Sequence, residues 1–227
     1  MFSNRAVLPM SLHCLGGLLW LALAPAASAA GLTQYRLDPV HTRVMFAVSH
    51  AGFSQAIGTV SGSTGTLQFD PADWSSAKLE VSVPLARIDL GDAEWNQAVQ
   101  GRKLLYVDTY PEATFTSTRI EPIDAHHATV FGTLRLHGAA KEIRLDVKLN
   151  QLKRHPMPPF RETAGFSATT TISRKAFGID AWPAVIGDSV ELRIEAEAQP
   201  IASNARDGAV DAVPSQTSAT QEPASTP

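Results

Sequence analysis

A strict alternation of apolar and polar residues runs through Ala128–Leu149, which reads ATVFGTLRLHGAAKEIRLDVKL. A period of two predicts β-strands that have one dry face and one wet face. The stretch His137–Glu142, which separates the two alternating halves, is short and contains glycine, as suits a hairpin loop. We expect Leu136 to pair with Ile143, which fixes the register of this hairpin. The other inward pairs are then Leu134–Leu145, Gly132–Val147 and Val130–Leu149.

The same alternation returns along most of the chain. It predicts further strands at Leu32–Leu37, Val44–Val48, Ile57–Phe69, Lys78–Leu85, Ala113–Ile120, Phe166–Ile172 and Val190–Ala198. The period becomes helical once, over about Ala93–Leu105, where Asp92 suits the N-cap. An open sheet of eight or nine antiparallel strands with one short helix cannot cover its own dry face. We therefore predict an all-β fold, and the glycines within Ile57–Phe69 favour a barrel because they permit the bends that closure needs.

The charge of the chain excludes one class of partner. Of its 227 residues 18% are charged, and the net charge is −3. Proteins that bind nucleic acids carry clustered Lys and Arg residues, and no such cluster occurs in this sequence. We therefore expect a domain of moderate size that has no nucleic-acid partner.

Residues 1–29 have the composition of a secretory signal peptide. Arg5 gives a positive start, Leu15–Ala24 is apolar, and Ala27–Ala29 is a small-residue cleavage site. We expect cleavage after Ala29, export to the periplasm, and no stable membrane insertion of the mature chain. An uncleaved anchor is the alternative, but the apolar run is shorter than the roughly 20 residues that cross a bilayer.

Both ends of the chain are expected to lie outside the folded domain. Cys14, the only cysteine, lies in the expected signal peptide, so the mature chain would have no disulfide and no thiolate ligand. Residues 201–227 are rich in Ala, Ser, Thr and Pro and contain no aromatic residue, which predicts a disordered C-terminal tail. A single domain is left at residues 30–200.

Several short motifs, in order along the chain, resemble those of the YceI-like family of exported lipid-binding proteins. They are Tyr35–Thr42 with Phe46–His50, Tyr110–Phe115, Gly132–Lys141, Ile172–Ile179 and Gly187–Val190. The resemblance spans about Tyr35–Ala198. It implies an eight-stranded, lipocalin-like barrel that holds a long isoprenoid chain, or a quinone-like or similar amphiphile, in the periplasm. Arg102–Asp108 departs from the acidic, aromatic segment that the family usually has there.

The predicted dry faces supply the candidate ligand-binding residues. Affinity for a lipid would come from apolar burial, so such a site needs few polar groups. Gly132 leaves a gap between bulky neighbours, where we expect a slender hydrocarbon chain to lie. The candidates for the wall of the cavity are Val44, Phe46, Val48, Leu79, Val81, Val83, Phe115, Val130, Gly132, Leu134, Phe166, Ile172, Leu192 and Ile194. The candidates for its mouth or lid are Phe53, Phe177, Ile179 and Trp182.

The sequence carries no catalytic signature. The motifs HExxH and GxSxG are both missing, and no cysteine nucleophile is expected in the mature chain. We therefore predict a non-catalytic protein without a resident metal or cofactor, whose ligand is a lipophilic small molecule. Two alternatives remain open: an interaction or structural barrel with a filled core, and a hydrolase or metal-dependent enzyme that uses His41 or His50. The sequence also leaves open whether two barrels form a homodimer.

Overall fold

A computed structural model of the chain describes residues 31–201. The expected signal peptide lies outside these residues, and so does the expected tail apart from Ile201. The strands are β1 (Thr33–Leu37), β2 (Arg43–His50), β3 (Ser54–Ser61), β4 (Thr64–Phe69), β5 (Lys78–Pro84), β6 (Ile88–Asp89), β7 (Glu112–Pro122), β8 (His127–Leu136), β9 (Ala139–Arg154), β10 (Glu162–Ser173) and β11 (Ile186–Pro200). The helix α1 spans Ala93–Gln100, and three short 3-10 turns lie at Trp74–Ser76, Leu85–Arg87 and Lys175–Phe177. None of the described helices has the length and apolar character needed to cross a membrane.

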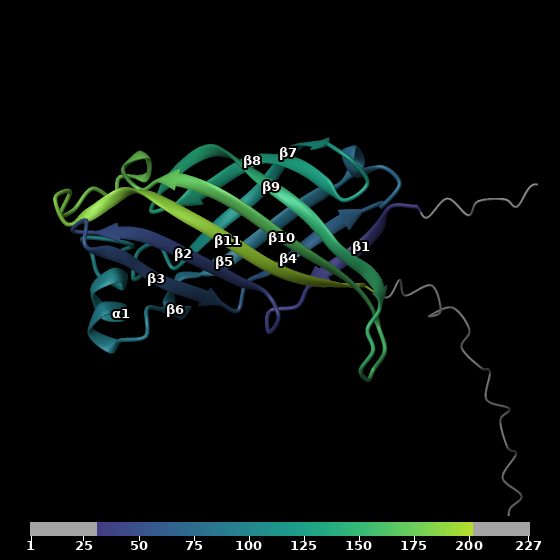
Figure 1. Cartoon of the computed structure of the whole chain (residues 1–227), viewed down its shortest axis with the longest axis horizontal. Coiled ribbons are helices and arrows are strands. Elements are labelled where there is room, and N and C mark those ends of the chain that lie inside the picture. The colour runs from purple at the N-terminus through teal and green to yellow at the C-terminus, as the bar shows by residue number, and fades with distance from the viewer. Residues whose placement is uncertain (1–30, 202–227) are drawn as a thin grey trace, which may run out of the picture.

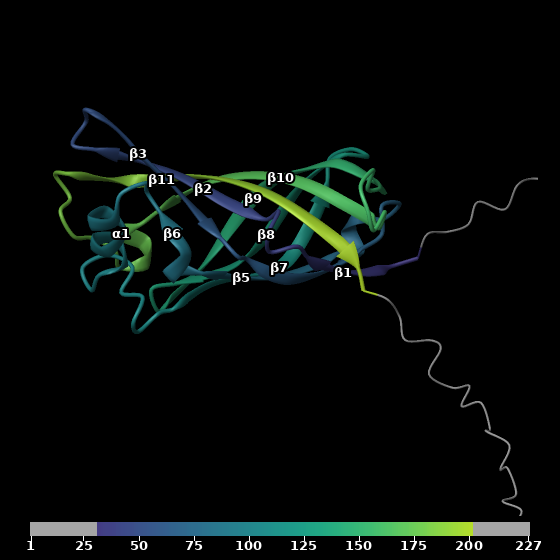
Figure 2. The ribbon, with the colours of Figure 1, turned by 90° about the horizontal axis from the view of Figure 1, so that it is seen from below.

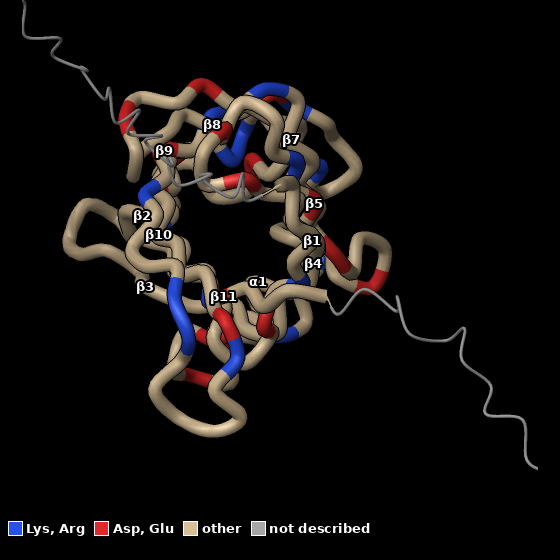
Figure 3. The backbone as a smooth tube through the Cα atoms, turned by 90° about the vertical axis from the view of Figure 1, so that its right-hand side faces the viewer, with Lys and Arg blue, Asp and Glu red and all other residues tan. Residues whose placement is uncertain are grey.

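The strands form a closed antiparallel barrel. The order β1-β4-β5-β7-β8-β9-β10-β11 makes a ring of eight, because β11 pairs back onto β1. Figure 3 looks into the end of the barrel, down its long axis, and Figures 1 and 2 show the barrel from the side. Closure leaves no exposed edge along the ring, which is how an antiparallel sheet of this size avoids pairing with other chains. The predicted all-β, eight-stranded barrel with one short helix is confirmed.

Two of the positions in the ring are shared by consecutive strands. One edge of the long strand β11 pairs first with β2 and then with β1, so that these two strands follow one another along the barrel wall. In the next position of the ring, β3 pairs with β2 and β4 pairs with β1, so these two strands also follow one another. The predicted single strand Ile57–Phe69 bends between them, at Gly62. Gly62 has φ of +79°, a left-handed conformation that is costly for a residue with a Cβ. The glycine therefore marks a bend, as the sequence suggested.

The register predicted for the β8–β9 hairpin is wrong. Leu136 pairs with Ala139, Gly132 with Ile143, and Val130 with Leu145. The connection is the two-residue turn His137-Gly138, and both residues have positive φ, as a tight hairpin turn requires. The observed register differs from the prediction by four residues. Because four is even, the same residues still point inward.

The helix is shorter than the predicted span of about Ala93–Leu105. Asp92 is its N-cap, as expected, and accepts a hydrogen bond from the backbone N–H of Trp95 at 2.9 Å. The helix ends at Gln100 because Gly101 adopts an extended conformation. The chain then continues as turns that bring Leu104 into the core. α1 lies at one end of the barrel, beside β6 (Figures 1 and 2).

Aromatic packing closes the other end of the barrel. The ring of Phe69 contacts those of Trp74 and Phe166 edge to face, with centroids 5.1 and 5.6 Å away. Tyr35 is buried beside them in the main hydrophobic cluster. Edge-to-face pairs of this kind stabilise a core beyond the apolar area that they bury. The end of the barrel that carries Trp74 is therefore the closed end.

Candidate ligand cavity

The barrel encloses an elongated apolar cavity of about 510 Å³. Its walls are the inward rows of the strands, for example Val44, Phe46 and Val48 of β2 and Leu79, Val81 and Val83 of β5. The β2 side of the lining extends from Thr42 to His50, which at a rise of about 3.3 Å per residue corresponds to roughly 26 Å along the strand. A cavity of this size and composition lies in the range of known small-molecule sites.

All the predicted wall and mouth residues line this cavity except Phe53, Gly132 and Phe177. The inward rows were predictable because alternation fixes which face of a strand is dry. The three exceptions each have a separate physical reason.

Gly132 does not provide a channel for a hydrocarbon chain. A Cβ at this position would lie 2.7 Å from Cε2 of Phe115 and 2.5 Å from the backbone oxygen of Thr116. The ring of Phe115, on the neighbouring strand β7, already fills the space above the glycine. The predicted gap is therefore occupied by a side chain of the wall itself.

Phe53 lies beyond the cavity instead of over it. It follows the β2–β3 turn, in which Ala51 and Gly52 have φ of +51° and +76°. The backbone N–H of Phe53 donates to the oxygen of His50 at 3.0 Å, and the side chain is 93% exposed. The ring therefore projects from the barrel and covers nothing.

Phe177 is part of the core and not of a lid. It is 2% exposed and packs in a second hydrophobic cluster with Leu104, Ile172 and Ile179. Partly buried residues of β8 and β9, including Ile143, pack against the same cluster. The pairing of β9 with β10 stops at Asp146 and Thr169, so Phe177 fills the side of the barrel where these two strands diverge.

The open end of the cavity is bordered by residues that both line it and reach the surface. Trp95 of α1 and Trp182 are each 44% exposed, and Val185 is similarly exposed. Trp182 was predicted at the mouth. Trp95 and Val185 were not predicted, because no pattern within a short helix or an irregular loop indicates which side chain faces a distant strand. Together with His50, these residues form the mouth of the cavity.

The loop that carries Trp182 and Val185 is held in place by Arg174. The guanidinium of this buried residue donates to the backbone oxygens of Ile179, Ile186 and Gly187 at 2.6–2.8 Å. Charged groups are buried in proteins only where hydrogen bonds replace the lost water, and here backbone carbonyls do so. Arg174 thus fixes one side of the mouth.

Three polar atoms along the cavity lack a partner. The hydroxyls of Thr42 and Ser63 and the indole Nε1 of Trp74 are buried and form no hydrogen bond within residues 31–201. Thr42 continues the inward row of Val44 and Phe46, and Ser63 precedes the inward row of β4. Apart from Ser49, His50 and Arg174, the other lining residues are apolar, so the cavity as a whole favours hydrocarbon over any charged ligand.

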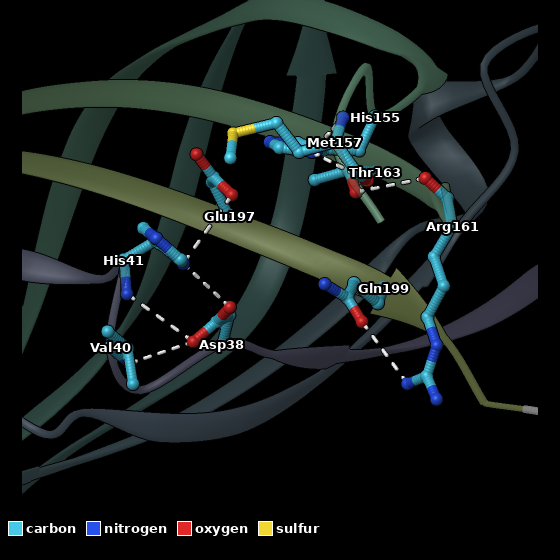
Figure 4. Close-up of polar contacts among 9 residues, drawn as sticks. All are labelled: Asp38, Val40, His41, His155, Met157, Arg161, Thr163, Glu197 and Gln199. Atoms are coloured by element: carbon cyan, nitrogen blue, oxygen red, sulfur yellow. Dashed lines mark hydrogen bonds and ion pairs between the residues drawn. The ribbon is translucent and has the colours of Figure 1, made fainter. Parts of the chain in front are cut away.

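A polar cluster lies outside the barrel, at the turn between β1 and β2. The Nδ1 atom of His41 lies 2.8 Å from Oδ2 of Asp38 and 3.9 Å from Oε2 of Glu197 (Figure 4). Asp38 also accepts hydrogen bonds from the backbone N–H groups of Val40 and His41. The three ligand-type atoms lie within 4.8 Å of one another, so they could hold a metal ion of the kind that imidazole and carboxylates bind.

The same contacts shift the protonation of this cluster. The hydrogen bond to Asp38, with the negative charges of Asp38 and Glu197, raises the pKa of His41 above its usual value. Burial alone would raise the pKa of Asp38, but the hydrogen bonds from His41 and from the backbone lower it below its usual value. His50, the other histidine named in the enzymatic alternative, does not belong to this cluster. His50 instead lies against Trp95, with ring centroids 5.3 Å apart.

Comparisons with known proteins agree with this architecture. The family model described as a YceI-like domain matches residues 35–198. A UPF0312 protein of Pectobacterium atrosepticum is 32% identical over 179 residues, which cover 78% of this chain and 92% of that protein. A UPF0312 protein of Pseudomonas savastanoi pv. phaseolicola is 33% identical over 182 residues, which cover 78% of this chain and 93% of that protein.

Solved structures show the same fold. The crystal structure of BcnA from Burkholderia cenocepacia is 25% identical, with a TM-score of 0.63, and the match covers 71% of this chain and 98% of that one. A domain from Saccharophagus degradans described as polyisoprenoid binding is 18% identical, with a TM-score of 0.54, and the match covers 75% of this chain and 100% of that one. The second likeness is one of fold alone.

Proposed function

Because this chain belongs to the YceI-like family, we propose that it is a non-catalytic, exported protein that holds a long isoprenoid or similar amphiphile in its barrel. The observation that carries the proposal is the apolar cavity of about 510 Å³ that runs from the Trp74 end to the mouth at Trp95 and Trp182. The Saccharophagus degradans domain is described as binding a polyisoprenoid, which makes this class of ligand a reasonable first choice.

The energy of binding would come from the hydrocarbon itself. Each CH₂ group that leaves water gains about 0.8 kcal/mol, so a segment of about 20 carbons would gain roughly 16 kcal/mol before any cost. Loss of overall motion and ordering of the flexible chain would offset a large part of this gain. The net affinity can still be high without polar contacts, which suits walls made almost wholly of aliphatic and aromatic side chains.

The two alternatives have less support. A barrel that acts only through its outer face would be expected to have a filled core, as small barrels commonly do, and this one has a cavity. A hydrolase that uses His41 would have to work at an exposed turn outside that cavity. In the structure Asp38 and His41 act as a cap of the β1–β2 turn, which accounts for their geometry without a reaction.

Native mass spectrometry of the purified protein tests the proposal. We expect an adduct of lipid mass that disappears after extraction with organic solvent and returns when an isoprenoid alcohol is added. A protein that carries no lipid after purification, and that takes up neither an isoprenoid alcohol nor a quinone analogue, would rule the proposal out.

A further inference from the structure

The mouth end of the barrel carries large apolar side chains that are exposed to solvent. We propose that this end docks on the surface of a lipid bilayer, and that the ligand passes between the bilayer and the cavity there. The docking surface, which we call the rim, consists of Phe53, Trp95, Lys103, Trp182 and Val185. This inference rests on the proposed function, because it concerns the route of the same ligand.

Contacts join these residues into one surface. The backbone N–H of Ala51, in the β2–β3 turn, donates to the oxygen of Val185 at 2.6 Å, which places the turn before Phe53 beside the 182–186 loop. The ring of His50 lies 5.3 Å from that of Trp95. The Nζ atom of Lys103 lies 5.4 Å from the centroid of Trp182. In Figures 1 and 2 the β2–β3 turn, α1 and the loop before β11 all lie at the same end of the barrel.

The side chain of Phe53 has no packing role in the barrel. Its side chain is 93% exposed at the tip of a hairpin, and it contacts neither the core nor the cavity. A bulky apolar group that is held out into water marks an interaction surface when other apolar groups adjoin it. Val185 belongs to the loop that bonds to the turn before Phe53, and Trp95 and Trp182 line the mouth with it. Each of these three side chains is also more than two-fifths exposed.

A bilayer fits this surface better than a second protein. Trp95, Trp182 and Val185 line the opening as well as the rim, so whatever covers the rim also covers the mouth. A bilayer at that place would let an insoluble chain enter the cavity without crossing water. Trp, with its amphipathic ring, and Lys, with its long apolar stem, are the residue types found at the boundary between lipid tails and headgroups.

Charge makes a smaller contribution to the rim. Lys103 and the neighbouring Arg102 would attract anionic headgroups. Two exposed acidic residues oppose this attraction: Glu94, which lies in α1 with Trp95, and Asp180, which lies in the loop that carries Trp182. We therefore expect docking to depend mainly on apolar contact and only weakly on salt concentration.

The chain offers a matched control for Phe53. Phe160 is 52% exposed in the β9–β10 loop, which lies at the closed end of the barrel (Figure 1), and it does not line the cavity. Replacement of either phenylalanine by serine removes the same exposed ring. Only the replacement at the mouth should affect exchange with a bilayer.

The experiment follows a fluorescent isoprenoid alcohol as it moves from vesicles to the full-chain protein. Vesicles of phosphatidylethanolamine with phosphatidylglycerol, and vesicles of phosphatidylcholine alone, are also sedimented with each protein. Phe53→Ser should slow the transfer and weaken sedimentation roughly tenfold, in line with the loss of one inserted aromatic ring. Its affinity for the same probe dispersed without vesicles should be unchanged, and Phe160→Ser should match the original protein throughout.

Several outcomes would overturn the inference. These are a failure of the original protein to sediment with either type of vesicle, a Phe53→Ser variant that behaves like the original protein, and a Phe160→Ser variant that loses as much as Phe53→Ser. A protein that takes up dispersed probe but shows one of these results keeps the proposed function and loses the bilayer. A protein that takes up no probe loses the proposed function, and sedimentation with the vesicles still decides whether the rim docks.

Discussion

At two positions in the barrel wall, a glycine makes room for an aromatic ring of the neighbouring strand. Phe115 lies over Gly132, and Phe46 lies over Gly58. In both cases a Cβ would meet the ring and also a backbone oxygen, which cannot move aside easily. Each ring therefore occupies the space that a side chain at the glycine would need.

We expect Gly132→Ala to lower the free energy of unfolding by about 1–3 kcal/mol, because the added methyl overpacks the contact with Phe115 and Thr116. Gly165→Ala is the control, since the nearest atom to its Cβ would be 3.9 Å away, and it should change stability by less than about 0.5 kcal/mol. Urea denaturation of both variants measures the difference. Equal stability of the two would show that the wall yields more readily than the structure implies.

The buried hydroxyl of Thr42 gives a second expectation at this scale. A buried polar group without a partner costs about 1–3 kcal/mol, and valine has nearly the same shape without the hydroxyl. Thr42→Val should therefore raise the free energy of unfolding of the lipid-free protein by about 1 kcal/mol. Thr59→Val, at an exposed position of β3, should have almost no effect. A loss of stability in Thr42→Val would mean that a buried water satisfies the hydroxyl.

At the scale of elements, the turn between β1 and β2 is held by a pair of groups that titrate. Asp38 has a lowered pKa, so its contribution to stability is present above about pH 3.9 and is lost as the pH falls through the lowered value. His41 has a raised pKa, so its contribution is complete below about pH 6.5 and is lost as the pH rises through the raised value. Both contributions are complete between roughly pH 4 and 6.5.

Titration of the His41 ring by NMR measures this coupling. The midpoint should lie above about 6.5 in the original protein and should fall toward that value in Asp38→Asn, which removes the carboxylate. Glu197→Gln should lower it by less, because Glu197 lies farther from the imidazole, at 3.9 Å. A midpoint that does not move in Asp38→Asn would show that the pair is not formed in solution.

The strands also show which features of the fold could be predicted from the sequence and which could not. Alternation identified nearly every strand and the inward rows of β2, β5 and β8, because a dry face needs an apolar residue at every second position. It could not fix the β8–β9 register, since loops of two and of six residues put the same residues inward, and only the backbone of His137-Gly138 separates them. Phe53 and Phe177 have the same apolar character in sequence, yet one is exposed and the other buried. Long-range packing decides such cases.

For the whole molecule, the central expectation is that a bulky side chain in the wall competes with the ligand. Val81 lies on the inward row of β5 and lines the cavity. Val81→Trp should reduce the affinity for an isoprenoid alcohol by at least about tenfold while the barrel stays folded, because the indole takes up volume that the ligand needs. Ile57→Trp is the control, since Ile57 is exposed on the outer face of β3. Equal losses in both variants, measured by displacement of a bound fluorescent probe, would place the ligand elsewhere.

The three tryptophans among residues 31–201 all line the cavity, Trp74 near the closed end and Trp95 and Trp182 at the mouth. The most direct test of the account therefore measures the fluorescence of a variant in which Trp74 is the only tryptophan. An isoprenoid alcohol with a quencher at the end of its chain is titrated into this protein. We predict saturable quenching of Trp74, because only a chain that runs the length of the barrel can bring the quencher to the closed end. Binding without any quenching of Trp74, with the quencher placed at either end of the ligand, would contradict the claim that the chain lies inside the barrel.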